Sequence, residues 1–263
     1  MKLGVFGCAG RMGRALIRAI HEKDGAELCA ATERPGLGMN GADAGHLAGV
    51  GDLGVTVSND TAAFAGCDAV LDFTAPDAST ELAASLAQMG VGHVVGTTGF
   101  AASHDETFAA LAERIPIVKS GNMSLGVNLL AALVERAARS LPDADLEILE
   151  MHHRRKVDAP SGTALLLGNA AAAGRNVGLR DKAVFAREGQ TGAREAGTIG
   201  FATLRGGTVI GEHEVILALD SERITLGHIA EDRTVFANGA VAAALWLSGR
   251  PAGLYTMNDV LGL

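Results

Sequence analysis

Residues 2–20 read KLGVFGCAGRMGRALIRAI: a β-rich run, a glycine turn and a helical pattern follow one another directly. Gly7, Gly10 and Gly13 have the spacing G-x-x-G-x-x-G, a variant of the dinucleotide fingerprint G-x-G-x-x-G in which Cys8 occupies the position of the first glycine. Gly7 frees the backbone at the turn, Gly10 lets the backbone approach a pyrophosphate, and Gly13 permits close packing of helix on strand. The N-terminus of the helix then offers N–H groups to phosphates, although a glycine turn that serves packing alone gives the same pattern.

The alternation of strand and helix continues through the first half of the chain. It comprises strand-like AELCAAT (26–32), CDAVLDFTAP (67–76), HVVGTTGF (93–100) and PIVKSGN (116–122), with helical patterns at about 11–20, 77–90 and 106–115. This alternation is typical of βαβ units around a parallel sheet. Asp77 or Ser79 is expected to cap the second helix, and Gly90 to follow its end. The glycine-rich stretch from Gly36 to Gly54 is predicted to be a long loop.

The pattern changes from Met123 onwards. A long amphipathic helix is expected over 124–141, followed by β-like runs with only one clear helix among them, at 163–174, before a helical pattern resumes near Asp232. The β-like runs are DLEILEMHH (145–153), GFATLR (200–205), TVIGEHEVILAL (208–219) and ERITLGHI (222–229). The expected class is therefore α/β, with an N-terminal Rossmann-like doubly wound parallel sheet plus a second α+β domain with an open sheet.

Composition excludes several classes of function. The chain has 263 residues, a formal net charge of −8 and only 4% aromatic residues, so it lacks the basic and stacking surface of a nucleic-acid-binding protein. Its three cysteines are widely spaced and contain no Cys-x-x-Cys pair, which indicates reduced thiols rather than a disulfide framework or a zinc site. No signal peptide or membrane span is recognisable, so a cytoplasmic location is expected.

Residues that follow the strands predict where a cofactor binds. Glu33 lies twenty positions after Gly13 at the end of the second strand, where a carboxylate accepts hydrogen bonds from the adenosine ribose of NAD. Arg34 and Arg11 can instead pair with the 2′-phosphate of NADP, so use of both NADH and NADPH is expected. The turns DFTAP and GTTG lie at the carboxyl ends of strands and place Phe73, Thr74, Gly96, Thr97 and Thr98 for contacts to the nicotinamide and its ribose.

The segment EMHHRRKVDAPSGTAL, residues 150–165, concentrates positive charge in an acidic chain. Consecutive residues of a strand point to opposite faces, so His152 and His153 do not readily share a metal ion, and no metal is expected. A solvated charged loop remains an alternative, above all for the two arginines. However, Ser161 or Thr163 can cap a following helix, whose N-terminus together with Lys156 suits a carboxylate. A histidine beside such an anion site suits proton transfer, which indicates an oxidoreductase that acts on a small anionic substrate.

Several stretches together resemble one enzyme family, essentially from end to end. They are GCAGRMGR, ATERPG, LDFTAP, GTTGF, SGNMSLGVN, EMHHRRKVDAPSGTAL, GTIGFATLRGGTVIGEH and FANGAVAAALWL. The most specific is H-H-x-x-K-x-D-x-P-S-G-T at 152–163. The chain resembles the dihydrodipicolinate reductase (4-hydroxy-tetrahydrodipicolinate reductase) family of the bacterial lysine and diaminopimelate pathway. The resemblance implies reduction of a cyclic dicarboxylate substrate, after loss of its 4-hydroxyl as water, to tetrahydrodipicolinate with NADH or NADPH.

The resemblance also implies roles for individual residues. His152 would donate or accept a proton, Lys156 would donate one, and His153, Gly162 and Thr163 would hold the substrate carboxylates. The cofactor would be surrounded by Gly7, Cys8, Ala9, Gly10, Arg11 and Met12, with Glu33 and Arg34 at the adenosine ribose and Gly96, Thr97, Thr98, Ser120, Gly121, Asn122 and Met123 near the nicotinamide. One departure is Ser120-Gly121, where Ala-Ala or Ala-Pro before the asparagine is more usual in the family.

The family also implies a domain arrangement. The dinucleotide-binding domain would span 1–122 and 231–263, since it includes the C-terminal helix, and 123–230 would bind the substrate and build a homotetramer through its sheet. Two alternatives stay open: another two-domain NAD(P)-dependent dehydrogenase with a small anionic substrate, and a non-catalytic nucleotide sensor. The first would need a different chemical motif such as a nucleophilic cysteine, and Cys8, Cys29 and Cys67 all lie in the nucleotide half. The second would not need the histidine–lysine cluster.

Overall fold

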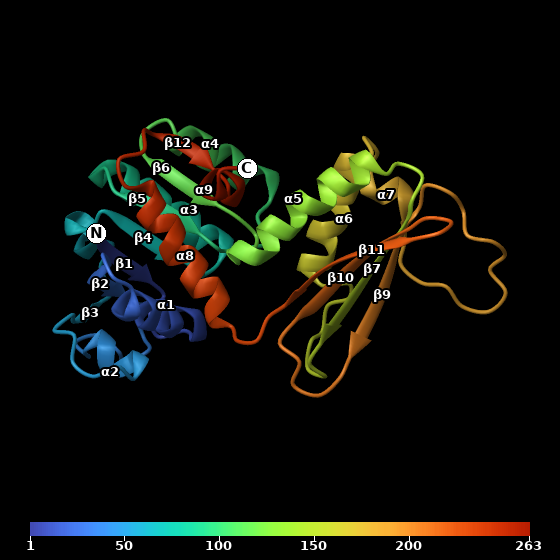
Figure 1. Cartoon of the computed structure of the whole chain (residues 1–263). Coiled ribbons are helices and arrows are strands. Elements are labelled where there is room, and N and C mark those ends of the chain that lie inside the picture. The colour runs from blue at the N-terminus through green and yellow to red at the C-terminus, as the bar shows by residue number, and fades with distance from the viewer. The chain divides into compact units, whose positions relative to one another are not determined.

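The computed structural model describes all residues from 1 to 263, and they form two compact units (Figure 1). Unit 1 comprises Met1–Leu125 and Thr234–Leu263, and unit 2 comprises Gly126–Arg233. By their contacts, residues 123–125 thus belong with unit 1 and residues 231–233 with unit 2. No helix combines the length and the apolar character that crossing a membrane requires.

Unit 1 is built on a seven-stranded sheet in the order β12-β6-β5-β4-β1-β2-β3, and every neighbouring pair is parallel. The strands are β1 (Lys2–Phe6), β2 (Glu27–Thr32), β3 (Val57–Ser58), β4 (Ala69–Asp72), β5 (Gly92–Val95), β6 (Pro116–Lys119) and β12 (Gly253–Tyr255). The strand order reverses at β1, which pairs with β2 on one side and β4 on the other. Ligands of such sheets bind outside the carboxyl ends of the strands at this reversal.

Helices cover both faces of this sheet. They are α1 (Arg11–Glu22), α2 (Ala44–Ala48), the 3₁₀ helix η1 (Thr61–Gly66), α3 (Pro76–Met89), α4 (Ala102–Leu111), α8 (Thr234–Leu247) and α9 (Met257–Leu261). Leu71 and Val94 pack in one apolar cluster with α1 and α8, whereas Val70 and Val95 pack in a second cluster with η1, α3 and α4. Because alternate side chains of a strand point to opposite faces, each central strand contributes side chains to both apolar clusters. The predicted doubly wound α/β class is confirmed.

The glycine turn has the geometry that its spacing predicts. Gly7 has a φ of +76°, a left-handed conformation that favours glycine. A Cβ on Gly13 would lie 2.2 Å from the carbonyl oxygen of Gly7, so only glycine lets α1 pack this closely on the turn. The first turn of α1 therefore lies directly beyond the carboxyl end of β1.

Two predicted details of unit 1 are wrong. The stretch 36–54 is not a continuous loop, because Asp43 caps α2 by accepting hydrogen bonds from the N–H groups of Gly45 and His46. Neither Asp77 nor Ser79 caps α3: the helix begins at Pro76, whose fixed φ suits a first helical position, and Ser79 is buried. Gly90 ends α3 in the left-handed conformation, as predicted.

Unit 2 contains a mixed five-stranded sheet in the order β11-β10-β7-β9-β8. The strands are β7 (Asp145–His152), β8 (Ala183–Val184), β9 (Ile199–Arg205), β10 (Glu212–Ala218) and β11 (Arg223–Ile229), and the helices are α5 (Leu125–Ser140, which starts at the end of unit 1), α6 (Gly162–Gly174) and α7 (Leu179–Lys182). Leu146 and Ile148 of β7 pack with α5 and α6 in one apolar cluster. The alternate residues Leu149 and Met151 point to the other face, so the sheet is open on one side, as predicted.

Candidate active site

A cavity of about 630 Å³ lies at the carboxyl ends of β1, β2 and β4 in unit 1. It is lined by Phe6, Gly7, Ala9, Gly10, Arg14, Glu33, Arg34, Leu37, Met39, Phe73, Thr74, Ala75 and Ala78. The structure thus brings seven predicted cofactor residues together here: Gly7, Ala9, Gly10, Glu33, Arg34, Phe73 and Thr74. The wall formed by Arg14, Leu37, Met39 and Ala78 was not predicted. Arg14 directly follows the glycine motif, whereas nothing in the local sequence connects the other three residues to that turn.

Glu33 is fastened to the glycine turn. One carboxylate oxygen accepts a hydrogen bond from the N–H of Ala9 at 2.9 Å, and the other accepts one from the N–H of Arg34 at 2.9 Å. Arg14 donates from Nε to the carbonyl oxygen of Ala9 at 3.0 Å. A carboxylate and two arginines therefore border one cavity, which fits the polar groups of an adenosine ribose and the phosphates next to it.

Other predicted cofactor residues do not line this cavity. Cys8 is completely buried, and burial, followed by the charge of Glu33, raises the pKa of its thiol to about 11. Met123 is also buried, in the apolar cluster beneath α8. Arg11 and Met12 begin α1 outside the lining. The two buried side chains support the sheet rather than present atoms to a ligand.

The turns after β4 and β5 are locked together by a buried carboxylate. Asp72 Oδ1 accepts hydrogen bonds from the N–H and the hydroxyl of Thr74 at 3.0 and 2.7 Å. The Thr97 hydroxyl oxygen accepts from the N–H of Thr74 at 2.9 Å and from the Ser79 hydroxyl at 2.9 Å. A Cβ on Gly96 would lie 2.2 Å from the Phe73 ring, so the ring lies directly over the second turn. The predicted nicotinamide residues Phe73, Thr74, Gly96 and Thr97 therefore form one rigid edge.

The turn after β6 is separately ordered. The Ser120 hydroxyl donates to the carbonyl oxygen of Asn122 at 2.7 Å, and the N–H of Ser124 donates to Asn122 Oδ1 at 2.9 Å. The N–H of Ser120 donates to the carbonyl oxygen of Val95. This turn thus belongs to the same carboxyl edge as the turn that carries Gly96 and Thr97.

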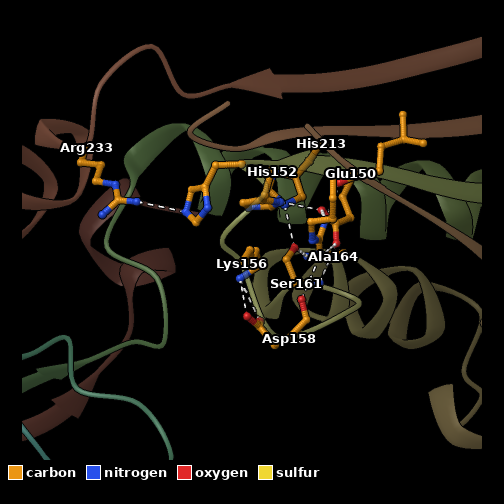
Figure 2. Close-up of polar contacts among 11 residues, drawn as sticks. Glu150, His152, Lys156, Asp158, Ser161, Ala164, His213 and Arg233 are labelled. Carbon is orange, nitrogen blue, oxygen red and sulfur yellow. Dashed lines mark hydrogen bonds and ion pairs between the residues drawn. The ribbon is translucent and has the colours of Figure 1, made fainter. Parts of the chain in front are cut away.

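In unit 2, the end of β7 carries a buried histidine–carboxylate pair (Figure 2). His152 Nδ1 lies 2.5 Å from Glu150 Oε2, and the side chain of Glu150 is 1% exposed. The same carboxylate accepts two hydrogen bonds from Arg205, both at 2.8 Å, and one from the N–H of Ser161 at 3.0 Å. Burial alone would raise the pKa of Glu150, but the hydrogen bonds from Arg205, His152 and Ser161 lower it overall, so Glu150 is a carboxylate.

A second buried histidine packs against the first. The rings of His152 and His213 meet edge to face with centroids 5.1 Å apart, and His213 Nε2 lies 2.9 Å from the hydroxyl oxygen of Ser161. Burial lowers the pKa of His213 to about 4, so this ring is neutral at pH 7. Burial also lowers the pKa of His152, against the opposing effect of Glu150. His152 is therefore a weaker base than an unperturbed histidine, and its imidazole is still a side chain suited to proton exchange.

The loop after β7 carries the remaining predicted residues. Lys156 Nζ lies 2.8 Å from Asp158 Oδ1, and Ser161 caps α6 by accepting a hydrogen bond from the N–H of Ala164, as predicted. Gly162 and Thr163 open α6 and so lie at its partly positive end. His153 directly follows the end of β7, and its Nε2 lies 3.3 Å from Arg233 Nη2.

Four members of this cluster were not given roles from the sequence: Glu150, Arg205, His213 and Arg233. Glu150 lies inside the quoted segment, where the spacing Glu-x-His on one strand places two side chains on the same face. Arg205, His213 and Arg233 are 55, 52 and 80 residues from their partners. No local signal points to them, because only the pairing of β7 with β9 and β10 brings the first two into contact.

Taken together, unit 1 has the sheet and glycine turn that bind dinucleotides, and unit 2 has a carboxylate-held histidine and a lysine suited to proton transfer. Chains with these two parts are nicotinamide-dependent oxidoreductases.

Comparison with known proteins narrows this class to one family. The family model described as "Dihydrodipicolinate reductase, N-terminus" matches residues 1–123, and the one described as "Dihydrodipicolinate reductase, C-terminus" matches residues 126–261. The chain belongs to the dihydrodipicolinate reductase family, as its sequence motifs predict.

Individual relatives agree with this membership. The chain is 58% identical to 4-hydroxy-tetrahydrodipicolinate reductase of Brucella melitensis biotype 1, over 100% of this chain and 99% of that protein. It is 59% identical to 4-hydroxy-tetrahydrodipicolinate reductase 1 of Mesorhizobium japonicum, over 100% and 97% of the two chains. Among solved structures, a dipicolinate-bound dihydrodipicolinate reductase from Paenisporosarcina sp. TG-14 has the same fold, with a TM-score of 0.80 at 24% identity over 98% of each chain.

Proposed function

We propose that this chain catalyses the NAD(P)H-dependent reduction of 4-hydroxy-tetrahydrodipicolinate, via dihydrodipicolinate, to tetrahydrodipicolinate in lysine and diaminopimelate biosynthesis. The observation that carries the proposal is the 58% identity to a 4-hydroxy-tetrahydrodipicolinate reductase over the full length of this chain. The match covers the whole chain and therefore spans both the glycine turn and the histidine–lysine segment. A cytoplasmic location goes with this proposal, since NAD(P)H and the precursors of the pathway are made there.

His152 and Lys156 are the proposed catalytic residues. The nicotinamide, when bound, supplies the hydride. His152 exchanges a proton with the substrate, and Lys156 donates a proton from Nζ. His153, Gly162 and Thr163 are proposed to hold the substrate carboxylates, since they combine a ring nitrogen beside Arg233 with the positive end of α6.

The cofactor is proposed to bind along the carboxyl edge of the unit 1 sheet. The residues proposed to contact or shape its site are Gly7, Cys8, Ala9, Gly10, Arg11, Met12, Glu33, Arg34, Gly96, Thr97, Thr98, Ser120, Gly121, Asn122 and Met123. Because Glu33 suits the ribose hydroxyls of NADH and Arg34 suits the 2′-phosphate of NADPH, both cofactors are expected to serve.

A direct assay tests the proposed function. Dihydrodipicolinate synthase generates the unstable substrate in the cuvette, and oxidation of NADH or NADPH is followed at 340 nm, with and without pyridine-2,6-dicarboxylate. Rapid oxidation that depends on the synthase and is inhibited by the dicarboxylate is expected. Oxidation only with another small anionic substrate would favour a different dehydrogenase, and nucleotide binding without turnover would favour a sensor.

The open face of the unit 2 sheet supports a homotetramer. Leu149, Met151, Leu204 and Ile229 border a cavity of about 510 Å³ there, and Ile229 is 67% exposed. Apolar side chains on one face of a sheet are usually covered by another chain or domain. Light scattering coupled to size-exclusion chromatography is expected to give four times the mass of the chain, and a monomeric mass would contradict this assembly.

A further inference from the structure

We infer that Glu150 is a positioning residue that fixes the tautomer of His152, so that Nε2 is the nitrogen that exchanges the proton in the reaction. The inference rests on the proposed role of His152 and adds to it the residue that sets which nitrogen reacts. It follows from the bonds of one buried carboxylate, shown in Figure 2.

The first step concerns the two ring nitrogens. A carboxylate only accepts hydrogen bonds, so the ring nitrogen 2.5 Å from Glu150 Oε2 must carry a proton. That nitrogen is Nδ1, which leaves the lone pair of the neutral ring on Nε2. A proton taken from or given to the substrate therefore passes through Nε2. The other ring proton stays on Nδ1, hydrogen-bonded to Glu150, and the carboxylate stays ionised.

The second step concerns the space around Nε2. A Cβ on Gly211 would lie 3.1 Å from His152 Nε2, so the glycine keeps one side of this nitrogen open. The side chain of His152 is 11% exposed, whereas that of Glu150 is 1% exposed. The ring of His152 thus has limited access to the surface, and the carboxylate that orients it has almost none.

The third step concerns what holds the carboxylate. Arg205 donates two hydrogen bonds to Glu150 and a third, at 2.8 Å, to the carbonyl oxygen of Asp158. The N–H of Ser161 also donates to Glu150, so one end of the 158–161 segment is bonded to the carboxylate that orients His152 and the other end to the arginine that holds this carboxylate. Edge-to-face contact with His213 restricts rotation of the ring. Glu150 cannot turn away without breaking four bonds.

Strand β7 offers a matched control for a purely structural role. Glu147 lies three residues before Glu150 and is likewise held by arginines, with Arg187 donating two hydrogen bonds at 2.9 Å and Arg194 one at 3.0 Å. It has no histidine partner. Glu147→Gln and Glu150→Gln therefore both remove a carboxylate of β7 that is held by arginine. Only Glu150→Gln also removes a hydrogen-bond partner of His152.

The test combines a spectrum with kinetics. In ¹⁵N-histidine-labelled protein, His152 is expected to show a protonated Nδ1 and an unprotonated Nε2 at pH 8, with the resonance assigned by its loss in His152→Gln. Glu150→Gln is expected to shift this signal toward the Nε2–H tautomer and to lower kcat about 100-fold, with the KM for NADH little changed, while Glu147→Gln leaves both unchanged. The log kcat profile against pH is expected to lose the limb assigned to His152. The groups that face His152 are the charged Glu150, Lys156 and Arg205 and the ring of His213, which is neutral at pH 7.

Other outcomes would overturn the inference. They are an Nε2–H tautomer in the unaltered protein, a Glu150→Gln variant with full kcat, or a Glu150→Gln/His152→Gln double variant in which the two losses multiply. If Glu150→Gln does not fold, the spectrum of the unaltered protein still decides, since it needs no substitution at Glu150. Because the spectrum is recorded without substrate, an inactive protein with the Nδ1–H tautomer would count against the proposed function and not against the role of Glu150.

Discussion

The hydroxyl oxygen of Ser161 lies 2.9 Å from His213 Nε2 and also accepts the capping hydrogen bond from the N–H of Ala164. One side chain thus joins the N-terminus of α6 to a buried histidine near the start of β10. A positive charge on His213 would therefore change the hydrogen bonding of Ser161 at the N-terminus of α6, where a substrate carboxylate is proposed to bind. The protonation of His213 is therefore coupled to the stability of unit 2.

We predict that unit 2 loses stability between about pH 6.5 and pH 4 because of His213. Burial holds the pKa of His213 near 4 in the folded chain, against 6.5 as its ordinary value. The unfolded chain thus binds more protons in this window, so stability is complete above pH 6.5 and falls as the pH falls, by up to about 3 kcal/mol. Chemical denaturation at pH 7.5 and pH 5 is expected to show a smaller loss for His213→Asn than for the unaltered chain. The exposed His46→Asn serves as control, and an equal loss in all three chains would contradict the prediction.

Substitutions at His152 and Lys156 are expected to differ in their kinetic effects. His152→Ala should lower kcat by about 10²- to 10⁴-fold and raise the KM for the substrate less, because it removes proton transfer more than binding. Lys156→Ala should damage both parameters, because the ammonium group is proposed both to donate a proton and to attract a carboxylate. Steady-state kinetics with Arg155→Ala, an exposed cation of the same loop, provides the control. An unchanged kcat in His152→Ala would rule out its role.

Asp158 is expected to compete with the substrate for Lys156. Its carboxylate is 56% exposed and lies 2.8 Å from Lys156 Nζ, and this ion pair lowers the pKa of Asp158. An exposed pair of this kind is worth roughly 0.2–1 kcal/mol, so Asp158→Asn should lower the KM for the substrate by roughly 1.4- to 5-fold. The bond from Arg205 to the backbone of residue 158 does not depend on the side chain, so the loop should keep its place. A raised KM would show that Asp158 orients Lys156 rather than competes for it.

Gly13 is expected to tolerate no side chain. The Cβ of Gly13→Ala would lie 2.2 Å from the carbonyl oxygen of Gly7 and 2.6 Å from the Cα of Cys8, both backbone atoms that cannot move aside separately. Moving α1 should lower the free energy of unfolding by about 2 kcal/mol or more and weaken NADH binding at least 10-fold. Gly66→Ala, whose Cβ would meet nothing closer than 3.9 Å, is the control. Calorimetry of the free protein and titration with NADH measure the two effects, and an alanine variant that binds NADH normally would contradict the expected clash.

The features that sequence could predict are those set by neighbours along the chain. The spacing of Gly7, Gly10 and Gly13 fixes a local turn, and Ser161 lies directly before the helix that it caps. By contrast, Arg205 and His213 reach the site through strand register, which the sequence pattern does not specify. Short elements such as α2 and β12 also cannot be recognised from the sequence, because five and three residues are too few to show a hydrophobic period.

Arg34 is expected to govern the preference between the two cofactors. Glu33 cannot turn away from a 2′-phosphate without losing its bonds to the N–H groups of Ala9 and Arg34, so NADPH depends on a cation to offset this charge. The exposed Arg34 lines the same cavity and is the cation nearest to Glu33 in sequence. Arg34→Ala should therefore raise the KM for NADPH about 10-fold and that for NADH less than 2-fold, a difference of one charge-assisted hydrogen bond. Arg18→Ala, which loses a bond to the carbonyl oxygen of Ala48 but does not line the cavity, should leave the ratio of the two KM values unchanged. Equal changes for both cofactors in Arg34→Ala would mean that the arginine contacts the shared pyrophosphate and that another group, such as Arg11 or Arg14, faces the 2′-position.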